Sequence, residues 1–150
     1  MALVKDITAQ AGQEVELKGW VYNFRSSGKI FFLQFRDGTG RVQVVFEQGK
    51  IPPGEWEALQ TLTIESSVIV SGTVKAEPRA PSGFEIAGTA VKIVSLAPEG
   101  YPIGKKEHGP DFLLDNRHLW LRSERQWAIL RVRDAIIHAT YDFFREHGWV

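Results

Sequence analysis

The sequence predicts an all-β fold, a closed barrel of five strands, followed by an irregular connector and one long α-helix. Three runs rich in β-branched and aromatic residues follow one another between residues 14 and 46. Their two connections have the Gly, Ser and Asp content of hairpin turns. A short helical segment and two more strand runs come next. This order of three strands, one helix and two strands is that of the five-stranded OB-fold, a Greek-key barrel.

The first strand run shows the alternation expected of a sheet with one buried face. In Glu14 to Arg25, the residues Val15, Leu17 and Val21 share one parity, which places them on the same side of the strand. The same reasoning applies to the other runs. These are Ile30 to Arg36, Arg41 to Phe46, Ser67 to Ala76 and Phe84 to Leu96.

Two further features agree with a small closed barrel. Gly19 and Gly72 lie inside strand runs, where glycine often marks the sharp bends that closure of a barrel requires. The segment Glu55 to Leu62 places Trp56 and Leu59 at helical spacing. We therefore expect a short helix that closes one end of the barrel.

The polar residues of the first three strands have an unusual placement. Aromatic residues next to arginine and side-chain amides on a sheet face make a surface that stacks nucleic-acid bases and reads their edges. An equally simple interpretation is a small barrel in which every phenylalanine is core, and this stretch alone leaves both open. The residues concerned are Arg25, Gln34 and Gln43, which interleave with Phe24, Phe32 and Phe35.

Composition narrows the class of protein. The chain has 150 residues, of which 43% are hydrophobic, as is usual for a globular chain. Its formal net charge is zero, so nucleic-acid binding would depend on the local placement of charge. The absence of cysteine excludes disulfides and thiolate metal sites. The first residues lack the apolar core of a secretory signal, and no apolar run is long enough to span a membrane. We expect a soluble, cytoplasmic protein without a membrane partner.

The last third of the chain differs from the barrel. Residues 99–122 are rich in Pro and Gly and are expected to form a connector or hinge. A helix is expected over residues 123–150, where Ser123 and Gln126 form a capping-box pattern. Its apolar residues form two stripes, which need more partners than one barrel supplies. We therefore expect a barrel domain over residues 1–98 and another domain beyond Val150.

At family level, the sequence resembles the N-terminal part of the class IIb aminoacyl-tRNA synthetases, in the asparaginyl branch. Each mark of this resemblance is weak alone, but their order and spacing make the match strong. The terminal helix resembles the start of class II motif 1. The marks are Gly19-Trp20-Val21, Arg36-Asp37-Gly38-Thr39-Gly40, Val42-Gln43-Val44, Ser71-Gly72-Thr73-Val74, residues 101–109 and Phe112-Leu113-Leu114-Asp115-Asn116-Arg117-His118-Leu119.

The resemblance implies roles for individual residues in binding a tRNA anticodon loop. Phe32 matches an aromatic residue that stacks on the middle anticodon base, and Gln43 matches the amide that hydrogen-bonds to that uracil. Arg25 matches a basic residue near the anticodon backbone, and Glu85 matches a carboxylate that reads a neighbouring base. Gln34 stands where aspartyl enzymes often carry an acidic residue.

The resemblance also implies what this stretch lacks. Motifs 2 and 3, which bind ATP and the amino acid in the family, are absent from the 150 residues, so we expect no catalytic residue, metal or cofactor in this chain. The whole protein would use ATP and Mg²⁺ to attach asparagine to its tRNA. It would form a homodimer through its catalytic domain and the 123–150 helix. Two alternatives remain: a free-standing single-strand-binding OB module, and the N-terminal region of an archaeal-type aspartyl-tRNA synthetase.

Overall fold

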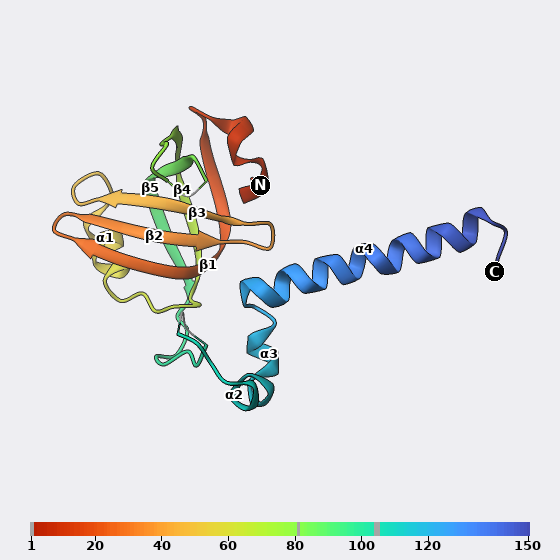
Figure 1. Ribbon diagram of the computed structural model, residues 1–150. Coiled ribbons are helices and arrows are strands. Elements are labelled where there is room, and N and C mark those ends of the chain that lie inside the picture. Colours follow the sequence, from red (N-terminus) through yellow and green to blue (C-terminus); the bar gives the residue numbers. More distant parts are fainter. Residues whose placement is uncertain (1, 81, 104–105) are drawn as a thin grey trace. The chain divides into compact units, whose positions relative to one another are not determined.

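The computed structural model describes residues 2–80, 82–103 and 106–150. The chain divides into two compact units, Met1–Tyr101 and Pro102–Val150. The first unit contains the strands and the second contains the long helix (Figure 1).

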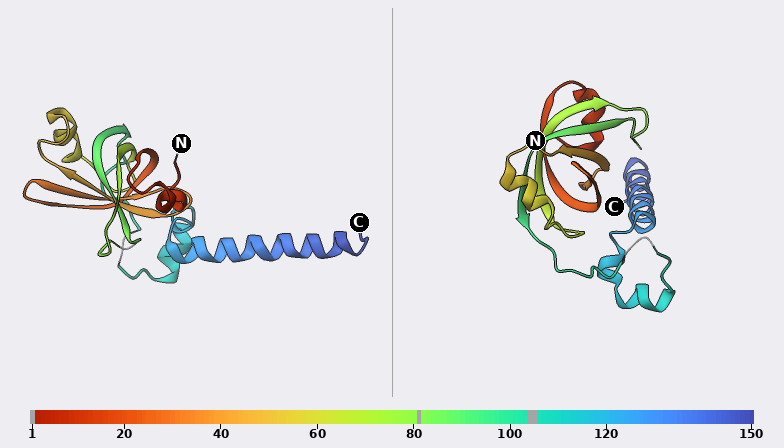
Figure 2. Two further views of the ribbon diagram at one scale, coloured as in Figure 1. Left: turned by 90° about the horizontal axis from the view of Figure 1, so that it is seen from above. Right: turned by 90° about the vertical axis from the view of Figure 1, so that its left-hand side faces the viewer.

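The first unit is a closed barrel with the strand order β1-β2-β3-β5-β4, which confirms the predicted OB-fold. All neighbouring pairs are antiparallel except β3 and β5, which run parallel. The views of Figure 2 show the strands curving around a common interior. The strands are β1 (Glu14–Ser27), β2 (Ile30–Arg36), β3 (Arg41–Glu47), β4 (Ser67–Ala76) and β5 (Phe84–Ser95).

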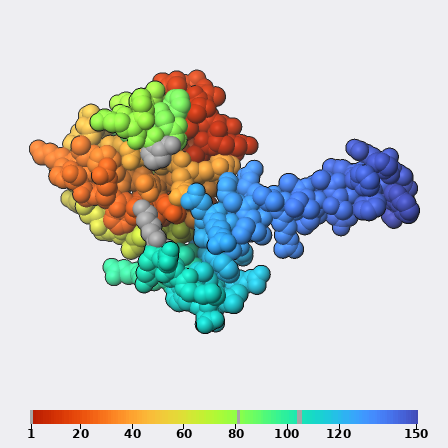
Figure 3. All heavy atoms as spheres, viewed as in Figure 1, coloured from red at the N-terminus to blue at the C-terminus, as the bar shows by residue number. Residues whose placement is uncertain are grey.

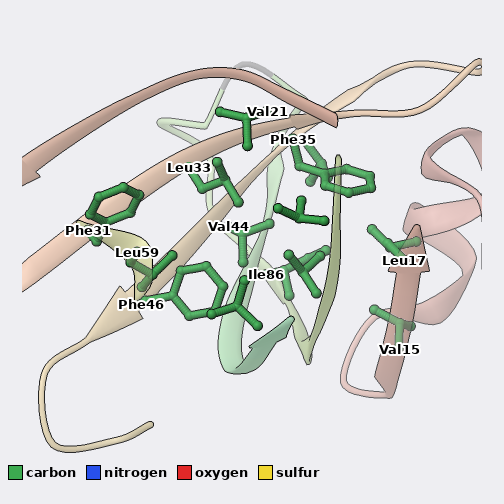
Figure 4. Packing of buried hydrophobic residues seen from close by; sticks show 14 of the residues in the cluster. Val15, Leu17, Val21, Phe31, Leu33, Phe35, Val44, Phe46, Leu59 and Ile86 are labelled. Carbon is green, nitrogen blue, oxygen red and sulfur yellow. The ribbon is translucent and has the colours of Figure 1, made fainter. Parts of the chain in front are cut away.

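The alternation of the strands produces the core. In β2 the side chains of Phe31, Leu33 and Phe35 are buried, while the residues between them are partly exposed. The buried side chains of the different strands meet inside the barrel (Figure 4). The interpretation in which every phenylalanine is core is therefore wrong for Phe32, whose parity places it on the outward side. The largest fully buried side chains include Phe31, Phe35, Phe46, Leu17, Leu33, Leu59 and Ile86.

The two strand glycines allow close approach between neighbouring strands. A Cβ atom at Gly19 would meet the backbone oxygen of Arg36, and one at Gly72 would meet the backbone oxygen of Ala87. The register of β4 against β5 also shifts beside Gly72, where Thr89 of β5 is the extra residue. The close approach at both glycines agrees with their expected place in a small barrel, because any larger residue would force the strands apart.

Two short helical segments contribute to the barrel core. The helix α1 (Pro53–Leu59) places Leu59 in the core cluster, and the Glu55 carboxylate accepts a hydrogen bond of 2.6 Å from the backbone N–H of Val91 in β5. The helix begins two residues before the predicted segment and ends three residues before its predicted end, so that Leu62 is buried in the turn that follows. Before β1, the 3₁₀-helix Val4–Gln10 adds Val4 and Ile7 to the core cluster.

Among its described residues, the second unit contains three helices, the short α2 (Pro110–Asp115) and α3 (Arg117–Trp120) and the long α4 (Glu124–Glu146). The connector therefore contains two helices that its irregular sequence did not predict. No residue of α4, which is coloured blue in Figure 3, is buried. Gly104 and Lys105, which belong to the connector motif, lie outside the described residues.

The two ends of α4 differ in how they satisfy the backbone. Ser123 is the N-cap as predicted, but its hydroxyl makes no cap hydrogen bond, so the capping-box bond is a wrong prediction. Only the Ser123 carbonyl takes part, as the acceptor for the N–H of Trp127. At the other end, Gly148 has a φ of 76°. The N–H of Trp149 then reaches the carbonyl of Phe144, which is a Schellman end.

Candidate nucleic-acid interface

The outward side of β1, β2 and β3 carries the polar residues singled out in the sequence. These strands lie side by side as a meander, shown in red-orange to orange in Figure 1. Their outward residues form cross-strand rows, because antiparallel partners point to the same face of a sheet. One row pairs Arg25 with Phe32, and the next pairs Asn23, Gln34 and Gln43.

The first row is an arginine stacked on an aromatic ring. The Arg25 guanidinium carbon lies 4.2 Å from the centre of the Phe32 ring, and the two residues are direct partners across β1 and β2. Such a cation–π pair holds a positive charge and a flat ring at the same place. A base that stacks on Phe32 either lies on the other face of the ring or displaces the guanidinium.

The second row continues across three strands and reaches β5. Gln34 is the direct partner of Gln43, and Gln43 is the partner of Glu85 across the parallel β3–β5 pair. The Gln43 amide Nε2 donates a hydrogen bond of 3.2 Å to Glu85 Oε2. All five residues expected in the site thus lie in two neighbouring rows, although Glu85 is far from the others in sequence.

A third row lies at the other end of these strands and was not part of the predicted site. Trp20, Arg36 and Arg41 are in register there, with the Arg36 guanidinium 5.9 Å from the Trp20 ring. Arg41 stacks over Tyr22 at 4.3 Å, and Arg36 forms a 2.9 Å ion pair with Glu65. The parity of the two arginines already placed them on the outward side. Tyr22 lies at the register shift in β1, so the alternation of residues along the strand does not predict which way its side chain points.

The loop between β4 and β5 carries a second charged pair. Arg79 Nε donates to Glu77 Oε1 at 2.9 Å, and the Arg79 side chain is 91% exposed. The hydrogen bonds from Arg79 lower the pKa of the Glu77 carboxyl below its ordinary value. The same bond raises the pKa of the Arg79 guanidinium. Because the pair neutralises itself, it adds little net charge near the rows. Pro81 of this loop lies outside the described residues.

Asp37 is a turn residue, as its sequence context predicts. Its Oδ1 accepts hydrogen bonds from the N–H groups of Thr39 and Gly40, and its Oδ2 accepts one of 2.9 Å from the N–H of Val4. The carboxylate is therefore fully engaged in holding the β2–β3 turn against the N-terminal segment. Within the described ranges, no group of three or more His, Asp or Glu side chains is placed to hold a metal ion.

The outward rows combine the three functions that single-strand recognition uses. An aromatic ring provides stacking, arginines provide positive charge, and side-chain amides provide hydrogen bonds to base edges. The strands β2 and β3 supply half of the residues in the two rows, and they are also the strands that OB-folds use for oligonucleotide binding. The residues in the two rows are Asn23, Arg25, Phe32, Gln34, Gln43 and Glu85.

The fold and this face define a nucleic-acid-binding OB barrel, and a family comparison agrees. Residues 15–94 match the family model described as OB-fold nucleic acid binding domain. The matched segment begins in β1 and ends in β5, so it covers the whole barrel. The chain therefore belongs to the OB-fold nucleic acid binding domain family.

Relatives identify the branch of this family. The asparagine–tRNA ligase of Symbiobacterium thermophilum is 55% identical over 139 residues, which cover 93% of this chain and 32% of that protein. The asparagine–tRNA ligase of Thermus thermophilus is 46% identical over 147 residues, with 98% and 34% covered. These matches confirm the predicted resemblance to the asparaginyl branch. The chain spans about a third of the length of the curated relatives it matches.

Solved structures give the same result. The asparaginyl-tRNA synthetase from Pyrococcus horikoshii, solved with asparaginyl-adenylate, has a TM-score of 0.91 and 34% identity, covering 99% of this chain and 35% of that one. The aspartyl-tRNA synthetase from Entamoeba histolytica has a TM-score of 0.88 at 24% identity, with 99% and 38% covered, and this likeness shows the fold alone. The comparisons thus favour the asparaginyl interpretation over both alternatives. No helix among the described residues is both long and apolar enough to cross a membrane.

Proposed function

We propose that this chain binds the anticodon loop of a tRNA for asparagine, as part of a longer asparagine–tRNA ligase. The observation that carries the proposal is the pair of rows on the outward face of β1, β2 and β3. The Arg25–Phe32 pair lies directly beside the Gln34–Gln43 pair. The relatives named asparagine–tRNA ligase support the identity of the nucleic acid.

In this proposal the residues of the two rows have different tasks. Phe32 stacks on the middle base of the anticodon, and Gln43 forms hydrogen bonds to the edge of that base, a uracil. Arg25 lies near the backbone phosphates, and Gln34 and Glu85 contact the neighbouring part of the loop. Stacking tolerates any base, whereas edge hydrogen bonds distinguish between bases.

The test compares Phe32→Ala and Gln43→Ala in titrations against stem-loops with uracil or cytosine at the middle position. Phe32→Ala should weaken binding of both loops by about 1–3 kcal/mol, which is the value of one base stacked on an aromatic ring. Gln43→Ala should cost about 1 kcal/mol with uracil, because a neutral hydrogen bond contributes that much, and little with cytosine.

Two controls make this test decisive. Circular dichroism confirms that each variant is folded, which is expected because Phe32 and Gln43 are on the outward side of their strands. Thr61→Ala, in the turn after α1, is a surface change outside the rows and should leave binding unchanged. If both row variants bind both loops as the unchanged chain does, the proposed face is wrong.

For the whole protein we propose ATP-dependent attachment of asparagine to its tRNA, with Mg²⁺ as the companion of ATP. The residues that bind ATP lie in the part of the protein beyond this chain. We also propose a homodimer formed by that part together with residues 123–150, and a cytoplasmic location. Residues 1–98 are the anticodon-binding domain in this proposal, residues 99–122 are a hinge, and residues 123–150 begin the catalytic domain.

A further inference from the structure

The turn between α1 and β4 contains an unusual backbone conformation at Glu65. Its φ is 70°, and among the described residues it is the one non-glycine residue with a positive φ. A residue with a Cβ atom adopts this left-handed conformation at a cost in energy, because the Cβ crowds the following carbonyl oxygen. Such a conformation persists only where the surrounding structure holds it, and it occurs preferentially at functional positions.

Two strands of the meander hold this turn in place. The Glu65 carboxylate forms a 2.9 Å ion pair with the guanidinium of Arg36 in β2, and the two side chains are only 7% and 15% exposed. The N–H of Glu65 donates to the carbonyl of Val21 in β1 at 2.8 Å, and the N–H of Val21 donates to the carbonyl of Ser66 at 2.9 Å. The turn is therefore joined to the backbone of β1 and to a side chain of β2.

Val21, to which the turn is bonded, lies directly before a β-bulge. The register of β1 against β2 shifts between Val21 and Asn23, so that Tyr22 is an extra residue in β1. An extra residue bends the strand and moves the side chains that follow it to the other face of the sheet. The two hydrogen bonds between Val21 and the turn thus fix the strand immediately before this change of face.

The bulge decides which residues of β1 face outward. The odd-numbered residues of β1 are buried up to and including Val21. Without an extra residue, Arg25 would continue this series and point into the barrel. After the bulge it is Phe24 that packs against the core, where its ring stacks on that of Phe31. Arg25 therefore points outward, and its guanidinium lies over the Phe32 ring.

We propose that Glu65 is a positioning residue for the RNA-binding face. Its ion pair with Arg36 keeps the strained turn formed, and the turn keeps the bulge of β1 in its place. The bulge points Arg25 outward, toward the backbone phosphates of a bound loop. Glu65 acts without touching the RNA itself. This inference rests on the proposed function, because it concerns the place of Arg25 in that site.

The ion pair is needed because the strain at Glu65 would otherwise be relieved. If the backbone of Glu65 relaxed to a negative φ, its N–H would turn away from the carbonyl of Val21, and the strand would lose its fixed point before the bulge. The extra residue could then move along β1 toward the β1–β2 turn. A bulge that lies beyond Arg25 returns this side chain to the inward parity, so its contact with Phe32 would be lost.

The test compares two variants that lack the ion pair and differ only in the strain at residue 65. Removing Glu65 alone would leave the charge of Arg36 buried and uncompensated, whereas replacing both members of a buried pair by uncharged residues is often tolerated. We therefore combine Arg36→Met with either Glu65→Ala or Glu65→Gly, called the alanine variant and the glycine variant. Both leave the net charge unchanged. Because glycine adopts a positive φ without strain, the turn should stay formed in the glycine variant only.

Nuclear magnetic resonance of the free chain measures the position of Arg25 without RNA. The Phe32 ring shifts the signals of the Arg25 side chain that lies over it. This shift should be largely lost in the alanine variant and kept in the glycine variant. Arg131, whose guanidinium lies 4.9 Å from the Trp127 ring in α4, is the internal reference and should not change. Equal Arg25 shifts in the two variants, whether kept or lost, would overturn the proposed role.

Titration with the stem-loop that carries uracil at the middle position measures the consequence for binding. The affinity of the alanine variant should fall by about tenfold, close to the low end for loss of a hydrogen bond to a charged group. Its slope of log affinity against log salt should be shallower by about 0.7, because one phosphate contact is lost. The glycine variant should match the unchanged chain in both quantities. A barrel that is merely less stable would keep the salt slope of its folded fraction.

The matched control is Thr63→Val, which weakens the same turn on its other side. The Thr63 hydroxyl donates a 2.7 Å hydrogen bond to the carbonyl of Ala97, beyond the end of β5. Its loss should lower Tm but leave the Arg25 signals and the salt slope unchanged. If Thr63→Val displaces Arg25 as much as the alanine variant does, general loosening of the turn is the cause and the positioning role is wrong. If no loop binds the unchanged chain, the proposed function fails, whereas the Arg25 signals still decide the role of Glu65.

Discussion

The two units of this chain use apolar residues in opposite ways. In the barrel, side chains such as Phe46 and Leu33 are fully buried, because alternate residues of every strand point into one interior. In α4, Val132 is 61% exposed and Tyr141 is 67% exposed. A closed sheet buries its own apolar face, whereas a single helix with two apolar stripes requires partners from elsewhere. The barrel is therefore expected to be stable alone, and the helix to depend on further protein.

Hydrogen exchange should show the largest difference between the two units. Backbone amides of β1 to β5 should exchange only through global unfolding, whereas those from Trp127 to Phe144 should exchange through local opening at little cost. Exchange mapped along the chain at low protein concentration measures both. Strong protection of α4 in a monomer would contradict the comparison, and protection that rises with concentration would indicate association through the helix.

Truncation of one phenylalanine in each unit should sharpen the comparison. Phe46→Ala should lower the free energy of unfolding by about 3–5 kcal/mol, because it leaves a cavity in the barrel core. Phe143→Ala, in α4, should change it by less than about 0.5 kcal/mol, since that side chain is 55% exposed. Urea unfolding followed by circular dichroism measures both. Similar losses would mean that α4 is packed as tightly as the barrel.

Two glycines within the barrel unit should respond in opposite directions to the same change. Gly72→Ala should destabilise by about 1–3 kcal/mol, because the added methyl group overlaps the Ala87 backbone and the Ile86 side chain. Gly54→Ala, in α1, meets nothing nearby and should stabilise by about 0.4–1 kcal/mol. Thermal unfolding of the two variants gives the sign directly. A neutral Gly72→Ala would show that β4 can move away from β5.

The smallest effect should come from the exposed pair Glu77 and Arg79. The pKa of Glu77 is lowered in the folded chain by its hydrogen bonds from Arg79. Its contribution to stability is therefore complete above the ordinary pKa of 4.5 and is lost as the pH falls through the lowered value. Glu77→Gln should lower Tm at neutral pH by no more than about 1–2 °C, since exposed ion pairs contribute little. The difference in Tm from the unchanged chain should shrink as the pH falls below 4.5, and a difference that grows with falling pH would contradict the expected sign.

Local patterns predicted the strands well, and they also predicted which side chains face outward. Phe32 and Gln34 alternate with Phe31, Leu33 and Phe35, and this alternation alone separates the site from the core. The glycines inside strands were likewise informative, because they lie where a neighbouring strand approaches closely.

Contacts between distant segments were not predictable in the same way. The bond from Gln43 to Glu85 spans 42 positions and depends on the parallel pairing of β3 with β5, which no local pattern encodes. The stacking of Arg41 on Tyr22 depends on a bulge in β1. The start of α4 at Ser123 was predicted correctly, but the expected hydrogen bond of its hydroxyl is absent. The position at which a helix begins does not determine the direction of a side-chain hydroxyl.

The Gln43–Glu85 hydrogen bond joins the parallel pair β3 and β5, and this position has a consequence for folding kinetics. The β1–β2 and β2–β3 hairpins join segments that are near in sequence, whereas β3 and β5 are separated by α1 and β4. Pairings between distant segments form late, because the entropy of closing a long loop must be overcome first. The meander alone would present Phe32 and Gln43, but not the Glu85 carboxylate that accepts a hydrogen bond from the Gln43 amide. In the function that we propose, a folding intermediate in which β3 and β5 have not yet paired would therefore lack part of the base-binding site, and full RNA affinity would report that the barrel has closed.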